Sequence, residues 1–364
     1  LDKILKKNKK KIIFVNNLND MKDCDLVFFS KDIPTDNRDK SLYIGIYKTI
    51  NKALIYLNKK TIFIILSQVK PGFTDSIKWN KKNLYYQVET LIFGKALSRA
   101  LKPEQFIVGS IDNKINKKYL KFLKSYKCKI NIMNYRSAEL AKISINLYLI
   151  SSLSFTNSLA ELCEKIDADW SKIRPILKQD KRIGKYAYLK PGLGISGGNL
   201  ERDLETFRNF LKFNKVYENY SRNIKEISNH RKDWIYNQFK KITKDFKNLK
   251  KIGVLGLAYK ENTNSIKNSP SISFIKKISL NNKYTINVFD PKIKKLSEHS
   301  NINICKNIND VMKNCEILFV ATPWKIFKKI KLKKFKNIKA IIDPYNLINF
   351  STDQKKIKHI SMGN

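Results

Sequence analysis

The first third of the chain alternates short apolar runs with amphipathic stretches. Buried strands are predicted at residues 11–15, 25–29, 61–66, 84–88 and 106–110. Between some of these runs, apolar residues recur at helical spacing, over 47–57 and 117–126. Strands that alternate with helices are typical of a parallel sheet covered on both faces, so we expect an α/β domain here.

The middle of the chain changes to helical periodicity. Residues 136–166 carry a long 3.6-residue pattern without Gly or Pro, which predicts one long helix. A shorter helix is predicted at 170–177, and residues 203–246 read as helical again. The long helix has an apolar stripe that one small domain would not cover, which favours a homodimer held by this helix. The stripe consists of Leu140, Ile143, Leu147, Ile150 and Leu153.

Strand–helix alternation returns at residue 251. Apolar runs predict strands from 251 and at 286–290, 316–322 and 340–344. The order α/β, helical, α/β predicts three domains, at residues 1–133, 134–246 and 247–364.

Composition narrows the class of protein. The formal net charge is +42, from 73 basic and 31 acidic residues, which alone would suggest a nucleic-acid partner. The lysines are scattered over every segment, however, without an Arg-rich stripe or an aromatic–basic platform, so no nucleic-acid partner is expected. The five cysteines and three histidines show no metal-ligand spacing, so we expect no metal site. Unpaired cysteines and the lack of an apolar run near 18 residues indicate a cytoplasmic protein without a membrane span.

The segment PGLGISGGNLERDL, residues 191–204, concentrates candidate chemistry. Four glycines, among them Gly194, Gly197 and Gly198, allow the backbone to approach a ligand closely. A helix is predicted to begin at about Asp203, so the loop would bring free amides and a carboxylate to one place.

Several segments, in order along nearly the whole chain, resemble the UDP-glucose/GDP-mannose dehydrogenase family. SQVKPGFT at 67–74 is similar to a turn that follows a strand in that family. Residues 88–109 and 137–169 resemble its glutamate-bearing segment and its central helix. Residues 191–204 resemble its active-site loop, and GVLGLAYKENTNSIKNSP at 253–270 resembles the start of its carboxyl domain.

The resemblance implies two Rossmann-like domains joined by a long-helix dimerisation domain, with NAD bound by the first and the sugar nucleotide by the third. It implies a homodimer that acts on a nucleotide sugar. It also assigns roles to individual positions. The implied catalytic residues are Lys142, Asn146, Asp203, Glu89 and Asn199. The residues implied to bind the cofactor are Ser67, Gln68 and Glu89. The residues implied to bind the substrate are Arg182, Gly194, Gly197, Gly198 and Lys260. Arg182 would reach a neighbouring subunit's ligand.

Two departures from the family pattern affect the expected chemistry. The family's catalytic cysteine falls at Asn199, whose amide is neither a nucleophile nor a leaving group. The printed sequence begins after the point where the family has its GxGxxG turn, so we expect an amino-terminally truncated chain that lacks the first βαβ unit and binds NAD weakly.

The favoured function is therefore NAD-dependent oxidation of a nucleotide sugar, in which Lys142 and Asn146 stabilise an oxyanion and a carboxylate accepts a proton. Two alternatives stay open: a single two-electron oxidation without a thioester, and a non-catalytic nucleotide-sugar-binding protein. Simpler roles also stay open for single residues. Lys142 could be a solvated lysine, and Asn157 and Glu161 could bond backbone or cap a neighbour.

Overall fold

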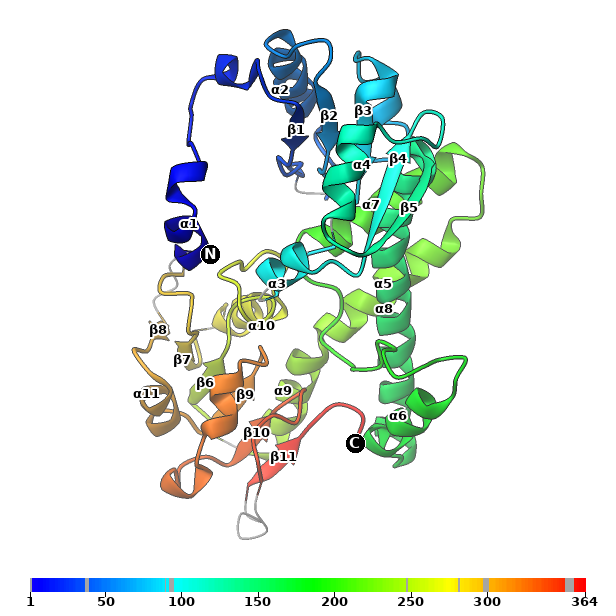
Figure 1. Cartoon of the computed structure of the whole chain (residues 1–364). Coiled ribbons are helices and arrows are strands. Elements are labelled where there is room, and N and C mark those ends of the chain that lie inside the picture. Colours follow the sequence, from blue (N-terminus) through cyan, green and yellow to red (C-terminus); the bar gives the residue numbers. More distant parts are fainter. Residues whose placement is uncertain are drawn as a thin grey trace. The chain divides into compact units, whose positions relative to one another are not determined.

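The computed structural model divides the chain into two compact units, Leu1–Asn146 and Leu147–Asn364 (Figure 1). It describes residues 2–36, 39–88, 90–91, 95–246, 248–280, 282–296, 301–350 and 357–364. Each unit has its own β-sheet, and a helical region lies between the two sheets along the chain. The α/β class with a central helical region is confirmed. The division into three domains at 133/134 and 246/247 stays a prediction.

The sheet of the first unit has the strand order β1-β2-β3-β4-β5. All neighbouring strands are parallel except β3 and β4, which are antiparallel. The described sheet departs from the expected parallel pairing at this pair alone, and the segment between β3 and β4 includes the six-residue helix α3. The strands of this unit are β1 Leu26–Phe29, β2 Ile62–Ile65, β3 Leu84–Gln87, β4 Gln105–Ser110 and β5 Lys129–Asn134. The helices that begin in it are α1 Asp2–Lys7, α2 Ile44–Ile55, α3 Ala96–Leu101, α4 Lys117–Lys124 and α5 Tyr135–Ile166.

The strand predicted at residues 11–15 is wrong. A 3-10 turn covers Lys9–Lys11, and the residues after it pair with no strand of the described sheet. Ile13 and Phe14 are 85% and 83% exposed. A short apolar run forms a buried strand only where it can pair with a neighbouring strand and is covered by other elements. The sequence pattern alone shows neither the neighbour nor the covering elements.

The helical region begins with α5, a single helix of 32 residues, as predicted. The stretch predicted as helical from 203 divides into three helices, and the first begins at Asn199, four residues before the predicted start at Asp203. The helices after α5 are α6 Trp170–Gln179, α7 Asn199–Phe213, α8 Asn219–Lys232 and α9 Trp234–Asp245. Among the described residues, no helix combines the length and apolarity needed to cross a membrane.

The apolar stripe predicted on α5 is mostly used inside the chain. Ile150 and Leu153 are buried in a cluster with Ile195, Leu204 and Ile224. Ile143 is also buried, whereas Leu140 is 47% exposed. The stripe therefore packs largely against this chain's own residues, and most of it is not left exposed for a partner subunit.

The sheet of the second unit is parallel throughout, in the order β11-β10-β9-β6-β7-β8. Strand β6 comes first along the chain and has β7 on one side and β9 on the other, so the connections leave it in opposite directions. Open α/β sheets bind ligands outside the carboxyl ends of the strands at such a reversal. The strands are β6 Lys251–Leu255, β7 Thr285–Phe289, β8 Ile302–Ile304, β9 Ile317–Val320, β10 Ala340–Ile342 and β11 Lys358–Ile360, and the helices are α10 Pro270–Ser279 and α11 Ile308–Lys313.

Candidate active site

The glycine loop that leads into α7 is held by hydrogen bonds to its backbone. The amide of Gly192 donates to Oδ1 of Asn157 on α5 at 2.9 Å, and the amide of Ile195 donates to Oγ of Ser228 on α8 at 2.7 Å. The amide of Gly197 donates to the carbonyl oxygen of Lys267 at 3.3 Å. Three separate segments of the second unit thus fix the path of the loop.

Two glycines of this loop are required by close contacts. Gly194 has φ +73°, and a Cβ there would lie 2.4 Å from the carbonyl oxygen of Ser228. Gly197 has φ +88°, and its Cβ would lie 2.5 Å from the ring of Tyr259. The close approach that these two glycines permit is to atoms of the protein itself, and the predicted approach to a ligand stays a prediction.

Gly194→Ala is expected to lower the Tm by roughly 4–8 °C, because a positive φ costs an L-residue about 1–2 kcal/mol and the collision with Ser228 adds to it. Gly192→Ala is the matched control, since Gly192 has no positive φ and a Cβ there would meet nothing within 4 Å. Thermal unfolding of the two variants checks this. Equal Tm values would show that the loop has another conformation.

Asn199 is the first residue of α7 and is exposed. The carboxylate of Asp203, one turn later, is buried, and its Oδ1 lies 3.7 Å from Nε of the buried Arg202. Glu201 pairs with Lys232 on α8 at 2.6 Å and also accepts a hydrogen bond from Asn268. The start of α7 therefore combines an exposed amide side chain with a buried carboxylate that has a cationic neighbour.

In the first unit, Lys142 and Asn146 lie four residues apart on α5 and share one helix face. Both side chains are half-buried. A solvated lysine would be expected to be exposed, as most lysines of this chain are, so the burial favours a specific role for Lys142.

The predicted cofactor residues follow β2. Oγ of Ser67 is buried and donates to the carbonyl oxygen of Lys31 at 2.6 Å, while Gln68 is half-buried. Strands β1, β2 and β3 are parallel, so their carboxyl ends meet at one sheet edge. A crevice of about 230 Å³ lies there, lined in part by Leu66, Gln87 and Val88. Glu89, predicted to take part in both catalysis and cofactor binding, lies outside the described residues.

The carboxyl ends of the second sheet carry Lys260, which is half-buried, and this burial lowers the pKa of its ammonium. Its Nζ lies 5.3 Å from the ring centre of Tyr259. The amides of Leu257 and Ala258, which follow β6, both donate to Oδ2 of the buried Asp290. Those two amides are therefore already satisfied by a carboxylate of the chain, and Lys260 is the better candidate to contact an anionic ligand.

Arg182 forms a bidentate pair with Asp180, two residues away, with contacts of 3.0 and 2.6 Å. Its side chain is 89% exposed. This exposure agrees with a residue that reaches beyond its own subunit, but the role itself stays a prediction. Among the described residues there is no group of three His, Cys, Asp or Glu side chains that could hold a metal ion.

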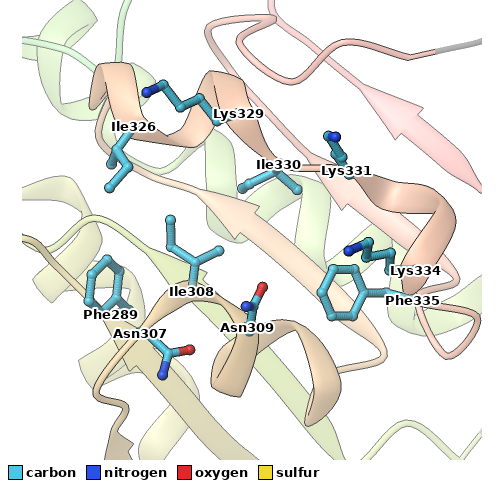
Figure 2. Close-up of a pocket in the computed structure, with 10 residues that line it drawn as sticks. All are labelled: Phe289, Asn307, Ile308, Asn309, Ile326, Lys329, Ile330, Lys331, Lys334 and Phe335. Atoms are coloured by element: carbon cyan, nitrogen blue, oxygen red, sulfur yellow. The ribbon is translucent and has the colours of Figure 1, made fainter.

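A second pocket, of about 360 Å³, lies between the end of β7 and the segment that follows β9 (Figure 2). Its apolar lining includes Phe289, Ile308 and Phe335, and the lysines that line it include Lys329 and Lys334. None of the residues assigned by resemblance lines it. Lysines are equally common elsewhere on this chain, so they do not mark the pocket as an anion site.

Two side chains of α5 have structural roles that the sequence left open or missed. Glu161 bonds Nε2 of His230 at 2.7 Å and pairs with Arg231 at 3.4 Å, so its described partners are side chains of α8 and not backbone. Glu139, which the sequence pattern did not single out, is completely buried and accepts two backbone hydrogen bonds. Its spacing from the buried Tyr135 and Ile143 was a usable signal, because it places a charged residue on a buried helix face.

Comparisons with known proteins agree with this architecture. Residues 136–230 match the model for the UDP-glucose/GDP-mannose dehydrogenase family, central domain, and residues 253–350 match that for the family's UDP binding domain. Together the two matches cover more than half of the chain. The UDP-glucose 6-dehydrogenase of Rickettsia conorii is 28% identical over 93% of this chain and 81% of its own length. The putative UDP-glucose 6-dehydrogenase YtcA of Bacillus subtilis is 26% identical over 90% of this chain and 79% of its own length.

Solved structures show the same fold. A UDP-glucose dehydrogenase from Pyrobaculum islandicum has a TM-score of 0.81 at 19% identity, over 97% of this chain and 83% of that one. A UDP-D-ManNAc dehydrogenase from Pyrococcus horikoshii has a TM-score of 0.80 at 20% identity, over 95% of this chain and 83% of that one. With both domain matches in the expected order, the chain belongs to the UDP-glucose/GDP-mannose dehydrogenase family.

Proposed function

We propose that the protein oxidises the sugar of a nucleotide sugar with NAD as hydride acceptor. The observation that carries the proposal is the half-buried pair Lys142 and Asn146 on one face of α5. Formation of NADH on mixing the protein with NAD and a nucleotide sugar tests it.

Ser67 and Gln68, which the resemblance assigns to the cofactor, follow β2 at one edge of the first sheet. NAD would lie at the carboxyl ends of β1, β2 and β3, where the crevice beside Leu66 and Val88 lies and where Ser67 and Gln68 follow β2. When bound, it supplies the acceptor for a hydride. The chain's own contribution is to hold the sugar and to stabilise the charge that develops on its oxygen.

Lys142 supplies the positive charge for this developing oxyanion, and Asn146 donates a hydrogen bond beside it. Asp203 is the proposed proton acceptor, acting through a water molecule, with Glu89 as the second carboxylate. As the alcohol carbon loses a hydride, the hydroxyl proton passes to this carboxylate, and the C–O bond becomes a carbonyl. Gly194, Gly197, Gly198 and Lys260 are proposed to contact the nucleotide sugar.

A second candidate, a single two-electron oxidation that ends at the carbonyl compound, is favoured by one observation. Asn199 occupies the place that the resemblance gives to the family's catalytic cysteine, and a carboxamide forms no thioester. Counting the NADH formed per sugar separates this candidate from a complete oxidation to the acid.

We propose a homodimer formed through an exposed face of α5. Tyr148, Phe155 and Leu162 recur at intervals of seven residues and are 75%, 65% and 52% exposed. Ile166, one turn further, is 62% exposed. Large apolar side chains that are exposed together mark an interaction surface, and a symmetric pair of these faces would cover them.

Phe155→Glu is therefore expected to raise the dimer dissociation constant by more than about tenfold, because it places a charge in the middle of the apolar face. Ile176→Glu is the control, since Ile176 is 66% exposed but lies on α6. Sedimentation velocity over a range of concentrations measures the change. A dimer of unchanged strength in Phe155→Glu would place the interface elsewhere.

A further inference from the structure

We propose that Glu139 is a positioning residue: its carboxylate fixes the turn Val69–Thr74 to α5, the helix that carries Lys142 and Asn146. The inference rests on the proposed function, because this turn directly follows Ser67 and Gln68, the residues assigned to the cofactor.

The geometry is specific. Oε2 of Glu139 accepts from the amide of Gly72 at 2.6 Å, and Oε1 accepts from the amide of Thr74 at 2.7 Å. The side chain is 0% exposed. An ionised carboxylate has only acceptors, so it satisfies two backbone donors at once, which a carboxamide of the same shape cannot do. The two bonds join segments 65 and 67 residues apart in sequence, so they hold the turn against the helix.

The position of Glu139 on α5 connects this anchor to the proposed chemistry. Lys142 and Asn146 follow it by three and seven residues, so the three side chains lie on neighbouring positions of one helix face. A shift of the turn relative to Glu139 is therefore a shift relative to Lys142. Displacing reacting groups by about 1 Å can cost on the order of 10²-fold in rate.

Charged and titratable groups near Glu139 come from the turn and from α5. Asp75 continues the turn and pairs with Arg136 at 3.1 Å, while Nζ of Lys81 donates to the carbonyl oxygen of Asp75 at 2.6 Å. On α5 itself, the hydroxyl of Tyr135 donates to the carbonyl oxygen of Leu84 at 2.8 Å.

Desolvation raises the pKa of Glu139 to about 7, despite the amides of Thr74 and Gly72, which lower it; Asp75 raises it further. The carboxyl group therefore changes its charge near neutral pH. Because the folded pKa lies above the usual 4.5, ionisation costs global stability as the pH rises from about 4.5 to about 7. The ionised form is nevertheless the better acceptor for the two amides, so the turn is held most firmly above pH 7.

Hydrogen exchange tests the structural part. Glu139→Gln leaves one of the two amides without an acceptor, so exchange in the peptide 69–76 is expected to rise about tenfold or more. In the wild type, protection of this peptide, corrected for intrinsic exchange, should increase as the pH rises through 7, and the variant should lack this dependence. Glu161→Gln is the control, because Glu161 also lies on α5 but bonds His230 and Arg231.

Kinetics test the functional part. Glu139→Gln is expected to lower kcat/KM for NAD about tenfold or more, with the KM for the nucleotide sugar within about twofold of the wild-type value. Should this variant fail to fold, Glu139→Asp keeps the charge with a shorter reach and is expected to show a smaller loss of the same kind.

Unchanged exchange in 69–76, or increased exchange with unchanged kinetics, would overturn the inference and leave the proposed function intact. A wild-type protein without turnover would overturn the proposed function and, with it, the positioning role. The exchange result would then still show whether Glu139 holds the turn.

Discussion

Replacing Lys142 with Met is expected to lower kcat by about two to three orders of magnitude, with a much smaller effect on the KM for the nucleotide sugar. A donor that acts on developing charge contributes most in the transition state, and removing one such group typically costs about 10²–10³-fold in rate. Lys142 is half-buried on α5, where its charge is less screened than at an exposed site.

Lys165→Met is the matched control, because Lys165 lies on the same helix and is exposed. Steady-state kinetics of the two variants measure the effect. If Lys142→Met retained kcat within about twofold of the wild type, Lys142 would be an ordinary surface lysine, and the proposed oxyanion role would be wrong.

The second large effect concerns Asn199. The wild-type protein is expected to release one NADH per nucleotide sugar and to leave a carbonyl product, whereas Asn199→Cys is expected to form acid with a second NADH. A thiol at this position would add to the aldehyde, and the adduct would lose a hydride to a second NAD and its hydroxyl proton to a base or solvent to become a thioester. Water then releases the acid and restores the thiol.

The structure can accommodate the substitution Asn199→Cys. Asn199 is exposed and begins α7, a helix of 15 residues, so the substitution removes no buried contact. A helix amino terminus also lowers the pKa of a thiol and raises its thiolate fraction. Asn209→Cys is the control, because it places a thiol on the same helix at another exposed position. Two NADH per sugar from the wild type at a normal rate would show that no cysteine is needed here.

Most of the buried strands could be predicted from the sequence, because a strand in the interior of a sheet consists of a continuous run of apolar residues. β2 and β9 are examples in which every residue is buried. It missed β5, β8 and β11, whose residues are partly exposed and carry lysine or asparagine among the apolar positions. Edge strands of this kind are formed by pairing with a neighbour, and a local pattern does not contain that neighbour.

The candidate site could likewise be predicted only in part from the sequence. The glycine loop was visible as a local cluster, but its anchors, Asn157 and Ser228, come from helices far away in sequence. Glu139 was missed because a glutamate in a helix of a highly charged chain is normally a surface residue. Its spacing from Tyr135 and Ile143 indicated a buried helix face, but the amides of Gly72 and Thr74 that it bonds belong to a turn that only the tertiary structure brings to α5.

Single-turnover kinetics with the protein in excess over a panel of UDP- and GDP-sugars test the central claim most directly. Calorimetric binding of each compound is measured in parallel. At least one nucleotide sugar is expected to bind to the protein and to reduce NAD, with the amount of NADH proportional to the sugar added. Binding of nucleotide sugars without NADH from any of them would contradict it, and would show a nucleotide-sugar-binding protein that does not catalyse oxidation.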